Sequence, residues 1–325
     1  MSFMPLPQPV FDFLKKSPKN FKHCTFLAGD ASFRKYYRAV EQGGTSFVVM
    51  HAPPPEDPRP FIKIGKTLES LGFCVPHVFE QDLENGYLLL QDFGDDLLSK
   101  VLKTTSNETI YYEELTDLLT TLCQKSQTIK GVCPYTVEDF LKEAMVFVEW
   151  YACDTLEKDA LDVFSKAYKD ICETLLNKTV NTIPHCLILR DFHIDNILIQ
   201  PNATGLEKYG LLDFQDAKVG PCVYDFVSLI QDARKDVAKD LQKQLWKKYL
   251  SFFQPSLHES LYQTGILLSA LRHLKIIGVF KRIQKRLNKD HYLAHLPRVF
   301  SYLEDCLKEP PLKELNTLLK DNMFL

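Results

Sequence analysis

The sequence lacks the features that mark a membrane-embedded protein or a disulfide-bonded secreted one. No stretch approaches the roughly eighteen uncharged apolar residues that a membrane-spanning helix needs. The first residues, MSFMPLPQPVFDFLKK, have neither the basic start nor the continuous apolar run of a signal peptide. The nine cysteines are scattered and form no CxxC pair, which argues against a disulfide framework and a zinc site. We therefore expect a cytoplasmic protein with reduced thiols and no membrane partner.

An excess of charge of either sign is also absent. The 39 Lys and Arg residues nearly balance the 42 Asp and Glu residues, and the formal net charge is -3. Nothing in this balance favours a nucleic-acid partner. The chain has 325 residues, of which 45% are hydrophobic and 25% charged, as in ordinary globular proteins. The length suits one bilobal unit or two modest domains, and we favour a monomer.

The chain starts rich in β-strands and becomes helical near residue 94. Residues 21–50 predict a hairpin around Gly43-Gly44, and residues 73–92 predict two further strands around Asn85-Gly86. We predict an α+β fold with a small antiparallel β-sheet lobe, residues 1–92, and a larger, mainly helical lobe, residues 93–325. Helical periodicity is found over residues 61–71, 108–128, 136–153, 157–177, 224–253, 257–287 and 290–308.

A short β-like island in the helical part carries the strongest chemical signal. Within residues 187–199, apolar strand residues flank a polar loop that contains Asp191, His193 and Asn196, and Asp213 ends a second apolar strand. Phosphoryl transfer needs a carboxylate for the hydroxyl proton, and an amide and a carboxylate to hold Mg²⁺ against a triphosphate. Asp191, Asn196 and Asp213 supply this set in order. Each residue alone could equally be a polar loop residue that satisfies backbone groups.

The ordered set resembles the motif of a known kinase superfamily. Asp-x-His-x-x-Asn followed by Asp-Phe is similar to the signature of the aminoglycoside phosphotransferase and choline kinase superfamily, whose members have a protein-kinase-like bilobal fold. Further segments resemble one subfamily, the N-acetylmuramate/N-acetylglucosamine 1-kinases of bacterial cell-wall recycling. These segments are residues 29–34, 48–54, 88–94, 213–217, 220–229, 272–275 and 296–298.

This resemblance implies a reaction and residue roles. It implies ATP, Mg²⁺ and transfer of the γ-phosphate to the anomeric hydroxyl of a small-molecule sugar. Asp191 would deprotonate that hydroxyl, Asn196 and Asp213 would hold the metal ions, and Asp225 would support the catalytic loop. For His193 we expect a hydrogen bond to a neighbouring carboxylate that organises the loop. A different small alcohol as acceptor, or a nucleotide-binding pseudokinase scaffold, are the alternatives.

The nucleotide side departs from the protein-kinase pattern. The expected phosphate loop has a single glycine, Gly29, whose backbone and the Ser32 hydroxyl could contact phosphates; a tight hairpin turn without a ligand is the alternative. The lysine expected on the third strand is missing, and Met50 stands near its place. Arg34, with Lys35 and Arg38 as alternatives, is the candidate counter-charge, because a guanidinium can bind phosphate in bidentate fashion. For the hinge, residues 91–94, we expect Gln91 to offer backbone groups to adenine and Asp92 to cap the turn.

The acceptor side is predicted from one helix and one cationic cluster. Glu143 and Glu149 could accept hydrogen bonds from sugar hydroxyls, and Trp150 could cover a C–H face. The same pattern also fits a helix with core aromatics and solvated acids. N-acetylmuramate carries a carboxylate that an arginine would bind in bidentate fashion. We expect Arg272 to contact either the acceptor or the catalytic loop.

Overall fold

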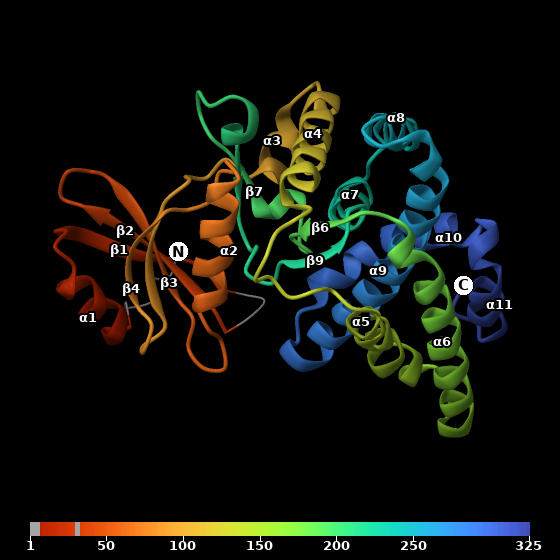
Figure 1. Cartoon of the computed structure of the whole chain (residues 1–325). Coiled ribbons are helices and arrows are strands. Elements are labelled where there is room, and N and C mark those ends of the chain that lie inside the picture. Colours follow the sequence, from red (N-terminus) through yellow and green to blue (C-terminus); the bar gives the residue numbers. More distant parts are fainter. Residues whose placement is uncertain (1–6, 30–32) are drawn as a thin grey trace. The chain divides into compact units, whose positions relative to one another are not determined.

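The chain folds as two compact units that are not split at a single point in the sequence. The computed structural model describes residues 7–29 and 33–325. One unit consists of Met1–Lys103 and Asp195–Asp216, and the other of Thr104–Ile194 and Ala217–Leu325. Figure 1 shows the elements of both units. The functional boundary after residue 92 stays a prediction.

The N-terminal unit is built on a five-stranded antiparallel sheet, as the sequence predicts. The predicted Asn85-Gly86 turn joins its last two strands along the chain. Gly86 has a φ of +73°, and a Cβ atom there would lie 2.2 Å from the carbonyl oxygen of Ala52, so only glycine fits. In spatial order the strands are β1 (Phe21–Ala28), β2 (Lys35–Glu41), β3 (Ser46–His51), β5 (Tyr87–Gln91) and β4 (Val78–Asp82).

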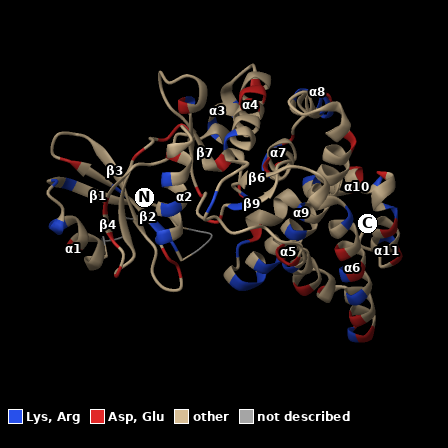
Figure 2. Ribbon diagram, in the orientation of Figure 1, with Lys and Arg blue, Asp and Glu red and all other residues tan. Residues whose placement is uncertain are grey.

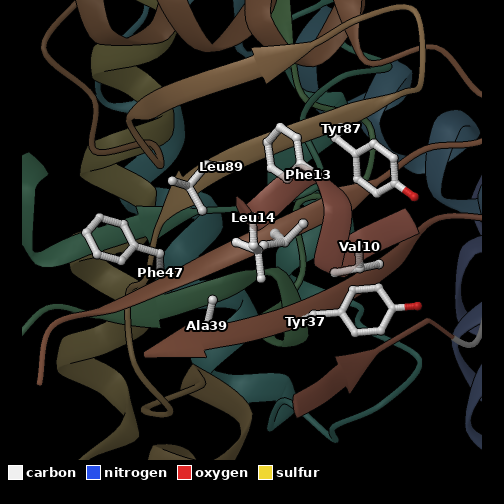
Figure 3. Packing of buried hydrophobic residues seen from close by; sticks show 9 residues of the cluster. Val10, Phe13, Leu14, Tyr37, Ala39, Phe47, Tyr87 and Leu89 are labelled. Carbon is white, nitrogen blue, oxygen red and sulfur yellow. The ribbon is translucent and has the colours of Figure 1, made fainter. Parts of the chain in front are cut away.

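A short N-terminal helix, α1 (Gln8–Lys16), packs against one face of this sheet. Its residues Val10, Phe13 and Leu14 are spaced i, i+3, i+4, which places them on one side of a helix. The sequence reading missed α1, because nine residues give too short a periodic pattern. Figure 3 shows its side chains in one buried cluster with alternate residues of three strands, namely Tyr37, Ala39, Phe47, Tyr87 and Leu89.

The helix α2 (Arg59–Ser70) connects the sheet with the segment 195–216 of the same unit. Phe61 stacks on Phe214 with ring centroids 4.7 Å apart, and Gly65 lies against the same ring. Phe214 is fully buried, so it anchors the residues that precede it in sequence. The segment itself forms a two-stranded antiparallel ladder of β7 (Ile197–Ile199) and β8 (Tyr209–Leu211). The helix α3 (Leu98–Thr104) comes at the end of the unit's first stretch.

The C-terminal unit is mainly helical and holds one two-stranded ladder, β6 (His185–Ile188) with β9 (Lys218–Pro221). The long helix α9 (His258–Leu287) confirms the prediction for residues 257–287. The prediction of one helix over residues 224–253 is wrong. That stretch is two helices separated at 231–238, where the Asp232 side chain accepts a hydrogen bond from the Arg234 N–H and forms a turn. The other helices are α4 (Glu108–Ser126), α5 (Val137–Trp150), α6 (Lys158–Thr179), α7 (Tyr224–Ile230), α8 (Lys239–Leu250), α10 (Leu296–Leu307) and α11 (Lys313–Asp321).

Charged residues of both signs are interspersed along the elements of each unit (Figure 2), in keeping with the small net charge. Across residues 7–29 and 33–325, no helix combines the length and the apolar character needed to cross a membrane.

Candidate active site

The predicted catalytic loop follows β6 and is held at its start by a buried carboxylate. Asp225, in the first turn of α7, is only 2% exposed and accepts hydrogen bonds from the backbone N–H groups of Leu189 (2.5 Å) and Arg190 (2.9 Å). Arg190 has a φ of 71°, a conformation that is costly for a non-glycine residue. Burial raises the pKa of Asp225 to about 7, against the opposing effect of these two donors. Asp225 therefore fixes the backbone just before Asp191.

A second buried carboxylate, which the sequence reading missed, holds the end of the same loop. Asp232 is fully buried and accepts hydrogen bonds from the backbone N–H groups of Ile194 (3.2 Å) and Arg234 (2.9 Å). The two aspartates thus bracket the loop that carries Asp191 and His193. The only local sign of Asp232 in the sequence is the polar run that directly follows α7. Its role could not be read from that run, because the bond to Ile194 spans 38 positions.

The acceptor candidate Glu143 lies beside the loop and is engaged by two cations. Its carboxylate accepts from the Arg190 guanidinium and from Lys275 Nζ, the latter at 2.8 Å. The Arg190 guanidinium also lies over the ring of Tyr135, 5.0 Å from its centroid. Burial raises the pKa of Glu143, but the positive charges of Lys275 and Arg190 lower it by more, so the net shift is downward. Glu143 is therefore an ionised member of a charge cluster at the loop.

The other acceptor candidates have different surroundings. Glu149 is exposed on α5, and the next residue, Trp150, is half-buried with the Arg286 guanidinium 4.7 Å from its ring centroid. Arg272 on α9 is 6% exposed. Burial lowers the pKa of its guanidinium, but electrostatic interactions with Tyr224 and with the carboxylates of Asp191, Asp232 and Asp225 raise it overall. Arg272 therefore lies in the electrostatic environment of the catalytic loop.

His193 is buried and uncharged at neutral pH. Burial lowers the pKa of its imidazole well below the ordinary value, and the positive charges of Arg234 and Arg272 lower it further. A neutral imidazole inside the loop is compatible with the predicted organising role. The expected hydrogen bond between His193 and a carboxylate stays a prediction.

The two predicted metal ligands, Asn196 and Asp213, are brought together inside the N-terminal unit. β7 and β8 are paired as far as Ile197 and Leu211, and the next backbone bond runs from the Leu212 N–H to the Asn196 carbonyl at 2.9 Å. This ladder places Asn196 beside the residue that precedes Asp213. Asp213 adopts a left-handed conformation (φ 55°), and its side chain is 43% exposed.

The composition of this pair fits Mg²⁺ better than a metal held by protein alone. In the part of the chain that the structure describes, no three His, Cys, Asp or Glu side chains are grouped so as to bind a metal. Mg²⁺ in phosphoryl-transfer enzymes is typically held by one or two protein groups together with phosphate oxygens and water. An amide and an accessible carboxylate therefore suit it.

The three candidate cations for the nucleotide phosphates have different ion-pair partners. Arg34 contacts Glu56 (2.8 Å) and Asp213 (3.5 Å). Arg38 instead contacts Asp92 (2.6 Å), Asp95 and the carbonyl of Gly94, so it stabilises the predicted hinge. Lys35 is exposed at the start of β2.

The remaining nucleotide candidates lie at the start of the phosphate loop and in the hinge. Gly29 follows β1, and Ser32 falls outside the described residues. Gln91 ends β5 and donates its backbone N–H to the carbonyl of His77 at 2.9 Å. Asp92 accepts from the backbone N–H of Gly94 at 2.9 Å, the geometry of a local turn cap.

Comparison with known proteins gives the family. A family model described as the phosphotransferase enzyme family, APH, matches residues 23–261. The chain belongs to this family. As a family member it is a kinase that transfers phosphate to a hydroxyl group.

Two curated relatives extend the similarity over most of the chain. Both carry the name N-acetylmuramate/N-acetylglucosamine kinase. The protein from Pseudomonas aeruginosa is 36% identical over 303 residues, which cover 90% of this chain and 86% of the relative. The protein from Neisseria meningitidis serogroup B is 31% identical, with 86% and 84% covered. The match therefore covers most of the length of this chain and of both relatives.

Solved structures support the fold. The choline kinase LicA from Streptococcus pneumoniae has a TM-score of 0.64 at 13% identity and covers 92% of this chain and 99% of its own. The gentamicin complex of APH(2")-IIa has a TM-score of 0.61 at 17% identity, with 95% and 98% covered. The predicted α+β, kinase-like fold of this phosphotransferase is thereby confirmed.

Proposed function

We propose that the chain transfers the γ-phosphate of ATP to the anomeric hydroxyl of N-acetylmuramate and N-acetylglucosamine, in bacterial cell-wall recycling. The observation that carries this proposal is the similarity, over about nine-tenths of the chain, to kinases named for these two sugars. The structural neighbours act as support for the fold only, because their identities are below a fifth.

In this proposal Asp191 is the general base. Its carboxylate orients the anomeric hydroxyl and accepts its proton while the sugar oxygen bonds to the γ-phosphorus and the bond to ADP breaks. The rigid backbone around it supports this role, since Asp225 and Asp232 hold the loop on both sides. A base fixed in this way needs little reorganisation during the reaction.

Asn196 and Asp213 would hold Mg²⁺, which when bound neutralises charge on the phosphate oxygens. Their adjacency across the β7–β8 ladder supports this assignment. The acceptor would meet residues of α5 and α9. Glu143 acts there through its ion pairs with Arg190 and Lys275, whereas Glu149 and Trp150 are proposed to contact the sugar.

For Arg272, the two predicted contacts are the acceptor and the catalytic loop. Its 6% exposure favours the loop, where its positive charge stabilises the carboxylates of Asp191, Asp225 and Asp232. A residue so placed would influence the rate through the loop and not through direct sugar recognition.

An ADP-release assay with a panel of acceptors tests the function. We expect turnover with N-acetylmuramate and N-acetylglucosamine and none with gentamicin or choline. Asp191→Asn should fold normally and keep its nucleotide affinity, while turnover falls by about 10²–10⁴, the usual effect of losing a general base. Glu138→Gln, at the exposed start of α5, serves as a carboxylate control for global effects and should retain far more activity.

Two outcomes would contradict the proposal. Turnover with gentamicin or choline but not with either sugar would assign a different acceptor. Nucleotide binding without turnover on any acceptor would favour a scaffold, the alternative suggested by the missing lysine.

A further inference from the structure

The third strand, β3, carries no lysine or arginine that could bind the nucleotide phosphates. Met50 occupies the middle of the sheet, is 1% exposed and pairs across the strands with Tyr36 and Leu88. A thioether cannot offset phosphate charge. Arg38, on the neighbouring strand, is committed to Asp92 and Asp95 at the hinge.

Arg34 has a different set of partners. Its Nη2 lies 2.8 Å from Glu56 Oε2, and its Nη1 lies 3.5 Å from Asp213 Oδ1. The exposed fractions of the Arg34 and Glu56 side chains are only 13% and 17%, against 43% for Asp213. An arginine guanidinium is charged at every physiological pH, so it can serve as a permanent cation. One edge of Arg34 is thus fixed by a shielded carboxylate, and the other faces an accessible one.

The position of Glu56 explains why the sequence pattern concealed this pair. In protein kinases a third-strand lysine is paired with a glutamate of the following helix. Here the corresponding helix, α2, has one carboxylate, Glu69, which stands in its last turn near His77. Glu56 precedes α2, in a proline-rich loop that reads as a simple connection.

We propose that Arg34 is the cation that binds the nucleotide phosphates, and that Glu56 is the positioning residue that holds it beside Asp213. This inference rests on the proposed function. This pair takes the place of the missing lysine–glutamate pair, and its two residues precede and follow the third strand in the sequence. Arginine suits this task, because its planar group has enough donors to keep Glu56 on one edge and present the other edge to an anion. When Asp213 binds a divalent cation, the edge that now faces Asp213 becomes available for phosphate.

Equilibrium binding of ADP with Mg²⁺, measured by calorimetry on the full chain, tests the pair independently of turnover. Arg34→Met should weaken binding about tenfold or more, equivalent to about 1.4 kcal/mol. Arg34→Lys should recover part of the loss, since it keeps the charge. Glu56→Gln should weaken binding less than Arg34→Met, and the double variant should bind no more weakly than Arg34→Met alone, because Glu56 acts only through Arg34.

The matched control is Arg59→Met. Arg59, the first residue of α2, pairs with Asp57 but is 62% exposed, and its replacement should leave ADP affinity unchanged. Thermal unfolding of each variant without nucleotide separates loss of binding from loss of fold. Kinetics add a second criterion, because the KM for ATP should rise while the KM for the sugar stays within about twofold.

The outcomes separate this inference from the proposed function. If Arg34→Met and Arg59→Met bind ADP equally well in an active enzyme, the inference is wrong and the function stands. If Glu56→Gln lowers ADP affinity further in the Arg34→Met background, Glu56 does not act through Arg34. If the unmodified chain binds nucleotide but phosphorylates neither sugar, the proposed function fails while the phosphate-binding pair is still tested by calorimetry.

Discussion

At the scale of single residues, the predicted catalytic loop is held by two buried carboxylates. Asp225 and Asp232 each accept backbone N–H groups, from Leu189 and Arg190 in one case and from Ile194 in the other. Leaving such a donor unpaired in the interior costs about 1–3 kcal/mol. The loop geometry therefore depends on side chains that never need to touch a substrate.

The raised pKa of Asp225 predicts a pH-dependent contribution to stability. The folded protein holds a proton up to about pH 7, whereas the unfolded chain releases it near the ordinary value of 3.8. Because the folded state binds the extra proton, this group makes the free energy of unfolding fall as the pH rises from about 4 to 7, by about 4 kcal/mol at most. Asp225→Asn lacks this dependence and also leaves one N–H without a good acceptor.

Urea unfolding of wild type and Asp225→Asn across pH 4–7.5 checks this prediction. The variant should be the less stable protein at pH 4–5, and the gap should narrow toward pH 7 and then stay constant. Asp236→Asn is the control, since Asp236 is 77% exposed in its ion pair with Arg298. A stability gap for Asp225→Asn that is constant over the whole range would show that Asp225 is already ionised in the folded protein below pH 7.

At the scale of elements, hydrophobic periodicity predicted helices that depend on the local sequence pattern. It failed where a tertiary contact ends a helix. The predicted helix over residues 257–287 is confirmed, and residues 264–274 within it are buried on all sides. The predicted helix over 224–253 is interrupted because the Asp232 carboxylate bonds backbone N–H groups at the turn and in the catalytic loop. The engagement of Glu143 by both Arg190 and Lys275 likewise joins residues 47 and 132 positions away, beyond any local pattern.

The crossing of α5 and α9 predicts a strict requirement for glycine at position 278. A Cβ atom on Gly278 would lie 2.3 Å from the carbonyl oxygen of Val146 and 2.8 Å from the backbone nitrogen of Phe147. Backbone cannot yield as a flexible side chain can, so Gly278→Ala must separate the helices. We expect a loss of about 1–3 kcal/mol in the free energy of unfolding, despite the better helix propensity of alanine.

Denaturant unfolding of Gly278→Ala and Gly43→Ala checks this requirement. A Cβ atom on Gly43 would meet no neighbouring side chain or backbone within 4 Å, so Gly43→Ala should change stability by less than about 1 kcal/mol. Equal stability of the two variants would mean that the α5–α9 contact is looser than the structure indicates. Reduced activity of Gly278→Ala is expected as well, because α5 carries Glu143 and α9 carries Lys275.

At the scale of the whole molecule, the sequence predicted the family and the fold class but not the supporting contacts. The assignment of Asp191, Asn196 and Asp213 as reacting groups rests on their order and spacing and stays a prediction. Glu56 and Asp232 were not found, because a carboxylate in a loop acquires its role only from the partner that folding brings to it. Spacing therefore predicts the reacting groups, and three-dimensional structure is needed for the groups that hold them.

The proposed anomeric position makes a prediction about the whole reaction. A kinase that phosphorylates the oxygen on C1 needs that oxygen as a free hydroxyl, whose proton Asp191 accepts. The methyl glycoside of N-acetylglucosamine keeps every other hydroxyl but has no proton at this oxygen. We expect the free sugar to be phosphorylated and the methyl glycoside to be inert in the ADP-release assay.

Because weak binding would also abolish turnover, the glycoside should be tested as an inhibitor; competitive inhibition without turnover is the expected result. Phosphorylation of the methyl glycoside at a rate comparable with the free sugar would place the reaction at another hydroxyl and refute the anomeric assignment, while leaving the chain a sugar kinase.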